Sequence, residues 1–251
     1  MPRRVALLLV LAAAALLPLG LAVRAFADEW RAPNLWPQQF GLRAVDVVSH
    51  DPSLRSAIIT SVVVALTAAL LAFPLAWPAA RSLGATPRRP LLLALLALPL
   101  LAPGYAVATG ISTWLVRLGI PGGMPSIVIA HLPSVLAYEI LLLLPAFDAR
   151  LRHLGEAGAV LGARPAIRTL IIELPARRGA VAAALVVGFT ASWAQYGTSL
   201  AVGAGTLTLP VVLVPFAQTD PQVAALLALI ALLPPVIGLI ASARSSSTLL
   251  G

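Results

Sequence analysis

Residues 156–175 read EAGAVLGARPAIRTLIIELP, and this charged, turn-containing stretch interrupts a chain built mainly of alanine, leucine and valine. Hydrophobic residues make up 60% of the 251 residues, charged residues only 10%, and the mean hydropathy is +0.97. Soluble domains carry about 25% charged residues, so this composition indicates an integral membrane protein.

Two residue types are missing, and their absence excludes several kinds of chemistry. The chain has no cysteine, which excludes disulfides, thiolate nucleophiles and cysteine-ligated metals. It also has no lysine, so all 17 basic residues are arginine and the net charge is +8. These arginines fall in the loops of a hydrophobic chain, where they set membrane orientation rather than bind nucleic acid.

The gaps between charged residues outline six apolar segments, each long enough for a spanning helix of about 20 residues. We therefore expect an all-α integral membrane protein with one transmembrane domain (1–251). The expected spans are about 5–26, 55–80, 90–112, 124–147, 180–202 and 221–243. Pro103 and Gly104 predict a kink in the third span, and GAGTLTLP (203–210) predicts a non-helical or re-entrant piece after the fifth.

The first segment has a second interpretation. MPRR, an apolar core and AFA before Asp28 are also typical of a cleaved secretory signal peptide. We favour an uncleaved helix, because the apolar run is longer than a usual signal core and Arg24 lies beside the cleavage point. The following segment, 28–54, alternates apolar and polar residues and predicts a short interfacial helix.

Arginine distribution predicts the orientation, with both termini cytoplasmic. With that orientation the inner side receives Arg3, Arg4, Arg81, Arg88, Arg89, Arg150, Arg152, Arg164, Arg168, Arg177, Arg178 and Arg244. The outer side receives only Arg24, Arg31, Arg43, Arg55 and Arg117, interspersed with Asp28, Glu29, Asp46, Asp51 and Asp220. Trp30, Trp36, Trp77 and Trp114 fall near span ends, as interfacial anchors do.

The largest cytoplasmic loop, 149–178, has helical periodicity on both sides of a turn. One apolar stripe is formed by Leu151, Leu154, Ala157 and Leu161, and a second by Ile167, Leu170 and Ile171. Gly162 and Pro165 break the helix between them. The stripe must be covered, either by the membrane face of the protein itself or by a partner subunit.

This loop resembles the EAA motif of the permease subunits of bacterial binding-protein-dependent ABC importers of type I. In that family E-A-A is followed by three residues, a glycine, nine residues and I-x-L-P. The matching positions are Glu156, Ala157, Gly158, Gly162, Ile172, Leu174 and Pro175. Gly158 stands where alanine is usual, a small-for-small exchange. The motif covers only this loop, whereas the resemblance in hydropathy extends over most of the chain.

The resemblance implies that the loop is a coupling helix that docks on an ATP-binding subunit, with Gly162 letting its two helices approach closely. It implies two ABC ATPase subunits, a second permease subunit, identical or different, and an extracytoplasmic substrate-binding protein, all at the bacterial inner membrane. A chain without lysine has no G-x-x-x-x-G-K-[ST] motif, so the partners would bind ATP and Mg²⁺. We expect no cofactor, metal site or catalytic residue in this chain.

Polar residues inside spans are candidates for the translocation path. They are Glu139 in the fourth span, Gln195 and Tyr196 in the fifth, with Trp193 as a weaker candidate, and Tyr105 and Thr109 in the third. Some of these residues can instead serve helix packing.

Two other classes of protein remain open. A secondary transporter driven by an ion gradient would use Glu139, although such proteins usually carry more intramembrane carboxylates and an internal repeat. A membrane-embedded enzyme would need a nucleophile and base or a metal cluster, which the sequence does not offer. The segments at 30–37 and 194–210 are somewhat similar to those of permeases for thiamine, ferric iron or polyamines.

Overall fold

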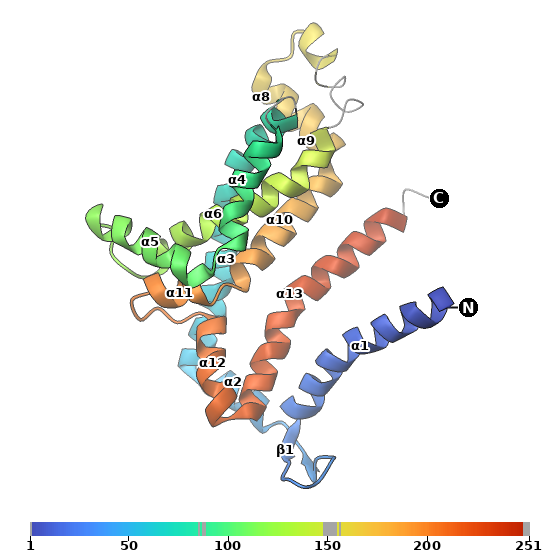
Figure 1. Cartoon of the computed structure of the whole chain (residues 1–251), viewed down its shortest axis with the longest axis vertical. Coiled ribbons are helices and arrows are strands. Elements are labelled where there is room, and N and C mark those ends of the chain that lie inside the picture. Colours follow the sequence, from blue (N-terminus) through green and yellow to red (C-terminus); the bar gives the residue numbers. More distant parts are fainter. Residues whose placement is uncertain (1, 85, 87–88, 148–154, 156, 248–251) are drawn as a thin grey trace. The chain divides into compact units, whose positions relative to one another are not determined.

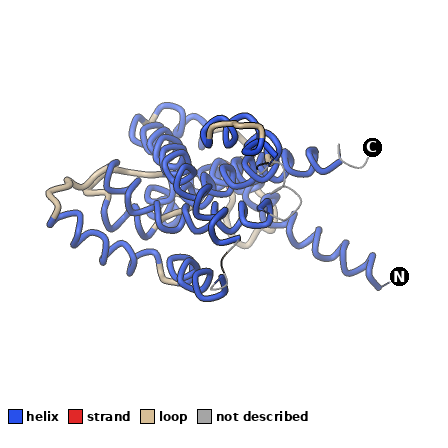
Figure 2. The backbone as a smooth tube through the Cα atoms, turned by 90° about the horizontal axis from the view of Figure 1, so that it is seen from above, coloured by secondary structure: helices blue, strands red, loops and turns tan. Residues whose placement is uncertain are grey.

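The computed structural model describes residues 2–84, 86, 89–147, 155 and 157–247. These residues are mostly helical (Figures 1 and 2), and they include one small two-stranded sheet, whose strand β1 is labelled in Figure 1. The chain divides into two compact units. One comprises Met1–Ser61 and Leu207–Leu233, and the other Val62–Thr206 and Pro234–Gly251.

The first unit joins both ends of the sequence. Its elements are α1 (Pro2–Ala25), the antiparallel strands β1 (Ala27–Glu29) and β2 (Gln39–Phe40), α2 (Arg43–His50), α12 (Leu209–Thr219), and the first parts of α3 (Pro52–Gly84) and α13 (Pro221–Ser247). Helix α2 is the short helix expected in segment 28–54. Asp51 accepts hydrogen bonds from the backbone and hydroxyl of Ser53 at the start of α3, and these bonds lower the pKa of the Asp51 carboxyl.

The second unit holds the remaining helices. They are α4 (Arg89–Leu101), α5 (Gly104–Arg117), α6 (Met124–Leu143), the 3₁₀ turn η1 (Leu144–Phe147), α8 (Pro165–Ile167), the π-helix η2 (Arg168–Glu173), α9 (Leu174–Ala176), α10 (Arg178–Trp193) and α11 (Gly197–Val202). The later parts of α3 and α13 complete it.

Three helices in the described part of the chain are long and apolar enough to cross a membrane. They cover Pro52–Gly84, Met124–Phe147 and Pro221–Gly238, and the pair α4 and α5 makes a fourth if its two helices form one span. Shorter apolar helices at Ala12–Ala25, Arg178–Trp193 and Leu209–Thr219 do not reach this length. The structure therefore supports a helical membrane protein, with fewer uninterrupted spans than the six predicted.

Helix α3 shows the packing pattern of a helix in lipid. In the second unit most of its buried positions are alanines (Ala65, Ala68, Ala69, Ala72, Ala76 and Ala80), with Val64 and Trp77 as the larger buried side chains. Its exposed positions include the large apolar residues Val62, Leu66, Leu70 and Leu75. Small residues inside and large ones outside allow close helix contacts while leaving an apolar surface, which suits hydrocarbon rather than water.

Trp77 is the largest of these buried side chains, and its predicted role at the membrane interface is wrong. It is buried, with its ring 5.0 Å from Phe147 in an edge-on arrangement and 6.0 Å from Phe73. The position near a span end could not distinguish an anchor from a core residue. Trp36 and Trp114, by contrast, are exposed.

Two predicted spans are interrupted. The third is bent by 97° between α4 and α5, because Pro103 lacks a backbone donor and disfavours helical geometry in Ala102. The fifth stops at Trp193 and resumes at Gly197. Residues 203–208 are non-helical, as predicted, but helix α12 begins immediately afterwards at Leu209.

The two interruptions meet in space. A Cβ atom on Gly197 would lie 2.9 Å from the backbone nitrogen of Tyr105, so only glycine allows this approach. At the start of α5, a Cβ atom on Gly104 would lie 3.9 Å from Gln195 Oε1, just before α11. The start of α5 and the start of α11 thus cross at backbone contact, side by side as in Figure 1.

Helices α6 and α10 pack through matched stripes spaced by four residues. On α6 the buried stripe is Ile127, His131, Val135, Glu139 and Leu143, and on α10 it is Ala184, Gly188 and Ser192. The Glu139 side chain is 0% exposed and occupies the space left by Gly188. A Cβ on Gly188 would lie 2.4 Å from Glu139 Oε1 and 3.0 Å from its Cγ.

This contact predicts that Gly188→Ala destabilises the protein. The added methyl overlaps Glu139, and overpacking of this kind costs about 1–3 kcal/mol. Gly179→Ala is the matched control, because it lies in the same helix with nothing within 4 Å of the new methyl. Thermal unfolding of the purified chain in detergent should show a lower midpoint for Gly188→Ala only, and Glu139→Ala should relieve part of the loss. Equal midpoints for the two alanine variants would contradict the contact.

Candidate functional site

A partly buried polar cluster lies at the interruption between α10 and α11. The Gln195 amide donates to the Ser134 hydroxyl of α6, and the Thr198 hydroxyl donates to Gln195 Oε1. The hydroxyl of Ser199 donates to the Gln195 backbone carbonyl at 2.8 Å. Of these three bonds, the last satisfies a backbone carbonyl at the break, and the other two join polar side chains to one another.

His131 on α6 connects this cluster to the end of α10. Its Nδ1 lies 2.7 Å from Ser192 Oγ and its Nε2 lies 3.1 Å from Ser199 Oγ. The Ser199 hydroxyl already donates to the Gln195 carbonyl, so the ring N–H at Nε2 is the donor in the contact with Ser199. His131 therefore joins the end of α10 to α11. This role of His131 could not be predicted from the sequence, because its partners lie 61 and 68 residues away.

Most of the predicted translocation-path residues lie near one another. Gln195 is in the break, Tyr196 follows it, and the backbone of Tyr105 touches Gly197. Thr109 is one turn further along α5, where its hydroxyl donates to the Tyr105 carbonyl at 2.9 Å. The tyrosines and Thr109 are exposed in the isolated chain, so a pathway or a second subunit can reach them.

Two of the candidates lie elsewhere. Glu139 is two turns along α6 from His131, within the α6–α10 contact, and neither of its oxygens has a hydrogen-bond partner among the described residues. Trp193 is buried and stacks on Phe189 with ring centroids 5.8 Å apart. Neither side chain is exposed in this chain.

The loop that carries the motif is a helical hairpin in its described part. Residues 157–160 are helical, a turn follows at Leu161 and Gly162, and α8 starts at Pro165. Gly162 has φ +78°, a left-handed conformation that favours glycine. Glu156 and the stripe residues Leu151 and Leu154 lie outside the described residues.

Close approach within the hairpin occurs at Gly158, not at Gly162 as predicted. A Cβ on Gly158 would lie 2.7 Å from Ile172 Cδ1, whereas nothing is within 4 Å of the same position on Gly162. Gly158 and Ile172, from the two ends of the motif, are therefore in contact. Gly162 serves the turn through its backbone conformation.

The hairpin presents large apolar side chains at its surface. Val160 and Leu161 are 88% and 86% exposed, and Leu170 and Ile171 are also exposed. Leu174 is half-buried against the second unit's core with Ala180 and Val181, and Pro175 is the second residue of the short helix α9 (Leu174–Ala176). The exposed residues form an apolar surface that the described chain leaves uncovered.

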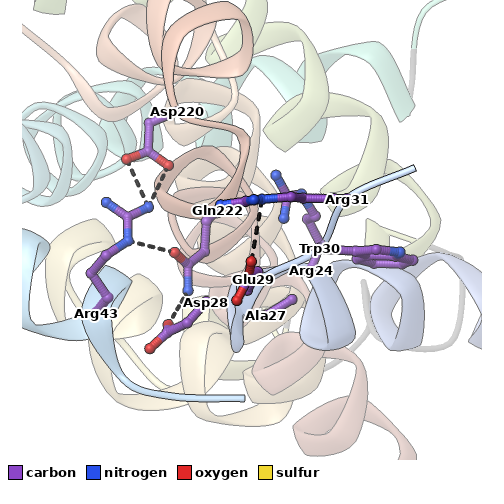
Figure 3. Close-up of a pocket in the computed structure, with 9 residues that line it drawn as sticks. All are labelled: Arg24, Ala27, Asp28, Glu29, Trp30, Arg31, Arg43, Asp220 and Gln222. Atoms are coloured by element: carbon purple, nitrogen blue, oxygen red, sulfur yellow. Dashed lines mark hydrogen bonds and ion pairs between the residues drawn. The ribbon is translucent and has the colours of Figure 1, made fainter. Parts of the chain in front are cut away.

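A second polar cluster lies in the first unit (Figure 3). Arg43 Nη2 donates to both carboxylate oxygens of Asp220 at 2.8 and 2.9 Å, and its Nε donates to Gln222 Oε1 at 2.8 Å. The buried Gln222 also donates to Asp28 Oδ1 at 2.7 Å. The surrounding pocket is lined by Arg24, Ala27, Asp28, Glu29, Trp30, Arg31, Arg43, Asp220 and Gln222.

The charged contacts agree with the sides assigned from the arginine distribution. Arg43, Asp28 and Asp220 were all assigned to the outer side, and they meet in one cluster. In the second unit, Arg81 contacts Glu173 of the loop predicted to be cytoplasmic. Each cluster therefore contains charged residues from one predicted side only.

Comparison with known proteins assigns no family, because no protein-family model matches the chain and no curated protein matches it significantly.

The outer cluster predicts that Arg43→Gln destabilises the chain. The substitution leaves Asp220 without its cation and the buried Gln222 with one bond fewer, at a cost of about 1–2 kcal/mol. Arg31→Gln is the control, because its ion pair with Glu29 is exposed and such pairs contribute less than about 1 kcal/mol. Thermal unfolding in detergent should show a clear loss for the first variant and little change for the second. The reverse order would contradict this account.

Proposed function

We propose that this chain is the transmembrane permease subunit of an ATP-driven ABC importer of type I, and that it forms half of a substrate translocation pathway. The main support is the loop at 157–175. There the spacing of the motif coincides with a physical hairpin, in which Gly158 meets Ile172 and Gly162 makes a left-handed turn. The surface of this hairpin is apolar, as a docking helix requires.

In this proposal six segments cross the bacterial inner membrane, with both termini cytoplasmic. The three long helices and the α4–α5 pair supply four crossings. Helix α1 and the interrupted α10–α11 segment supply the other two. Broken crossings are common near the binding sites of transporters, where the released backbone groups face a cavity or buried polar partners.

The proposed function requires three kinds of partner. Two ABC ATPase subunits would bind ATP and Mg²⁺ and dock on the hairpin, and their closure would switch access to the pathway. A second permease subunit, identical or different, would complete the pathway beside Tyr105, Thr109, Gln195 and Tyr196. An extracytoplasmic binding protein would deliver the substrate, for which thiamine, ferric iron and polyamines are the candidate classes.

The alternative, a secondary transporter driven by an ion gradient, has Glu139 as its main support. A carboxylate that carries an ion must reach an aqueous path. The Glu139 side chain is instead enclosed between its own helix α6 and helix α10, against Gly188. The apolar hairpin would also have no purpose in a transporter that works without a soluble partner. We therefore favour the ABC permease.

Substitution of Gly162 tests the proposal. Gly162→Val forces a β-branched side chain into a left-handed conformation, which costs more than about 1 kcal/mol and displaces the turn. Gly162→Asn is the matched control, because asparagine tolerates this conformation. The tagged chain, purified from its native membranes, should bring down an ATP-hydrolysing subunit. The valine variant should reduce that recovery at least threefold, and the asparagine variant should not.

Insertion of both variants is checked by their yield in the membrane fraction. An ATPase recovered equally with wild type and Gly162→Val would contradict docking through the hairpin. A wild-type chain that recovers no ATPase would contradict the proposed function itself.

A further inference from the structure

The Glu173 carboxylate is buried at the base of the hairpin and has two cationic partners. Its side chain is only 3% exposed. Oε2 lies 3.1 Å from Arg81 Nη1 at the cytoplasmic end of α3, and Oε1 lies 3.4 Å from Arg168 Nε. Gly155 provides room for it, because a Cβ there would be 2.6 Å from Oε1. A carboxylate at this depth is stable only while such partners remain.

The π-helical geometry of η2 explains the pair with Arg168. In an α-helix, residues five apart point to different faces, but the wider turn of a π-helix places them one above the other. Arg168 and Glu173 are the first and last residues of η2. The ion pair and the unusual turn therefore support each other, and π-turns are frequent at functional sites.

Arg177 extends the connection to the end of α6. It is buried, and its Nε donates to the Ala146 carbonyl at 2.9 Å. Its guanidinium lies 4.9 Å from the centroid of the Phe147 ring, and that ring also packs against Trp77 of α3. Arg177 Nη1 also donates to the Glu173 backbone carbonyl at 3.3 Å.

These contacts join the hairpin to the ends of two long helices. Glu173 forms an ion pair with Arg81 on α3, and Arg177 donates a hydrogen bond to a carbonyl of η1 at the end of α6. Leu170 and Ile171, within the same π-helix, are exposed at the hairpin surface. The exposed hairpin surface, η2 and the contacts on α3 and η1 are thus directly connected.

We propose that Glu173 is a positioning residue, which transmits movement of the docked hairpin to α3 through Arg81. This inference rests on the proposed function, because the movement comes from an ATPase subunit. Glu173 contacts neither substrate nor nucleotide in this scheme. Its loss should leave docking intact and uncouple ATP hydrolysis from rearrangement of the transmembrane helices.

The test uses the complex of this chain with its co-purified ATPase subunit. The chain has no cysteine, so Ala106→Cys on the exposed part of α5 gives a single reporter. Its labelling rate with a maleimide is measured with and without ATP and vanadate. In the otherwise wild-type chain we expect nucleotide to change this rate at least threefold. In Glu173→Gln the change should fall below about 1.5-fold, with ATPase recovery and hydrolysis within twofold of wild type.

Arg81→Gln serves as a second variant, because Arg81 is partly exposed and its loss should not prevent folding. It should give the same uncoupling, whereas the exposed Arg89→Gln on the same predicted side should not. A full nucleotide response in both Glu173→Gln and Arg81→Gln overturns the inference. Two other results also overturn it. One is a labelling rate that does not change with nucleotide in the otherwise wild-type chain, and the other is a loss of ATPase recovery in the variants as large as their loss of nucleotide response. Absence of any ATPase from the wild-type preparation overturns the proposed function instead.

Discussion

A backbone amide or carbonyl within hydrocarbon finds no water and must bond inside the chain. This constraint explains why the described residues are mostly helical, and why each interruption of a predicted span is accompanied by polar side chains. At the break after Trp193, the Ser199 hydroxyl donates to the Gln195 backbone carbonyl, while Thr198 and His131 bond to neighbouring polar side chains. The same constraint favours close contacts through alanine and glycine, as on α3 and at Gly188.

Much of the helical plan follows from the sequence because apolar length and arginine placement report directly on lipid and on orientation. The breaks follow only in part. The bend at Pro103 and Gly104 was predicted, whereas Pro99 lies within α4 without ending it. The fifth span contains no proline at its break, so its interruption depends on tertiary contacts with Ser134 and with the backbone of Tyr105.

At the candidate site, too, some features follow from the sequence and others depend on tertiary contacts. The spacing of the motif predicts a turn at Gly162, and the left-handed φ there confirms the turn. The prediction of close approach was placed on the wrong glycine, because sequence distance does not reveal that Gly158 faces Ile172. Glu173 occupies the variable position of I-x-L-P, so the pattern gave no reason to select it. Its importance depends on Arg81, which lies 92 residues away.

The central claim is that the exposed tip of the hairpin meets a soluble ATP-binding subunit. A photo-reactive amino acid in place of Leu161, which is exposed at the tip, tests it most directly in intact cells. The same group at Leu66, on the exposed apolar face of α3, is the control. The account predicts that Leu161 forms a covalent adduct with a polypeptide that binds ATP, and that Leu66 does not. Adducts with lipid alone at both positions would contradict it.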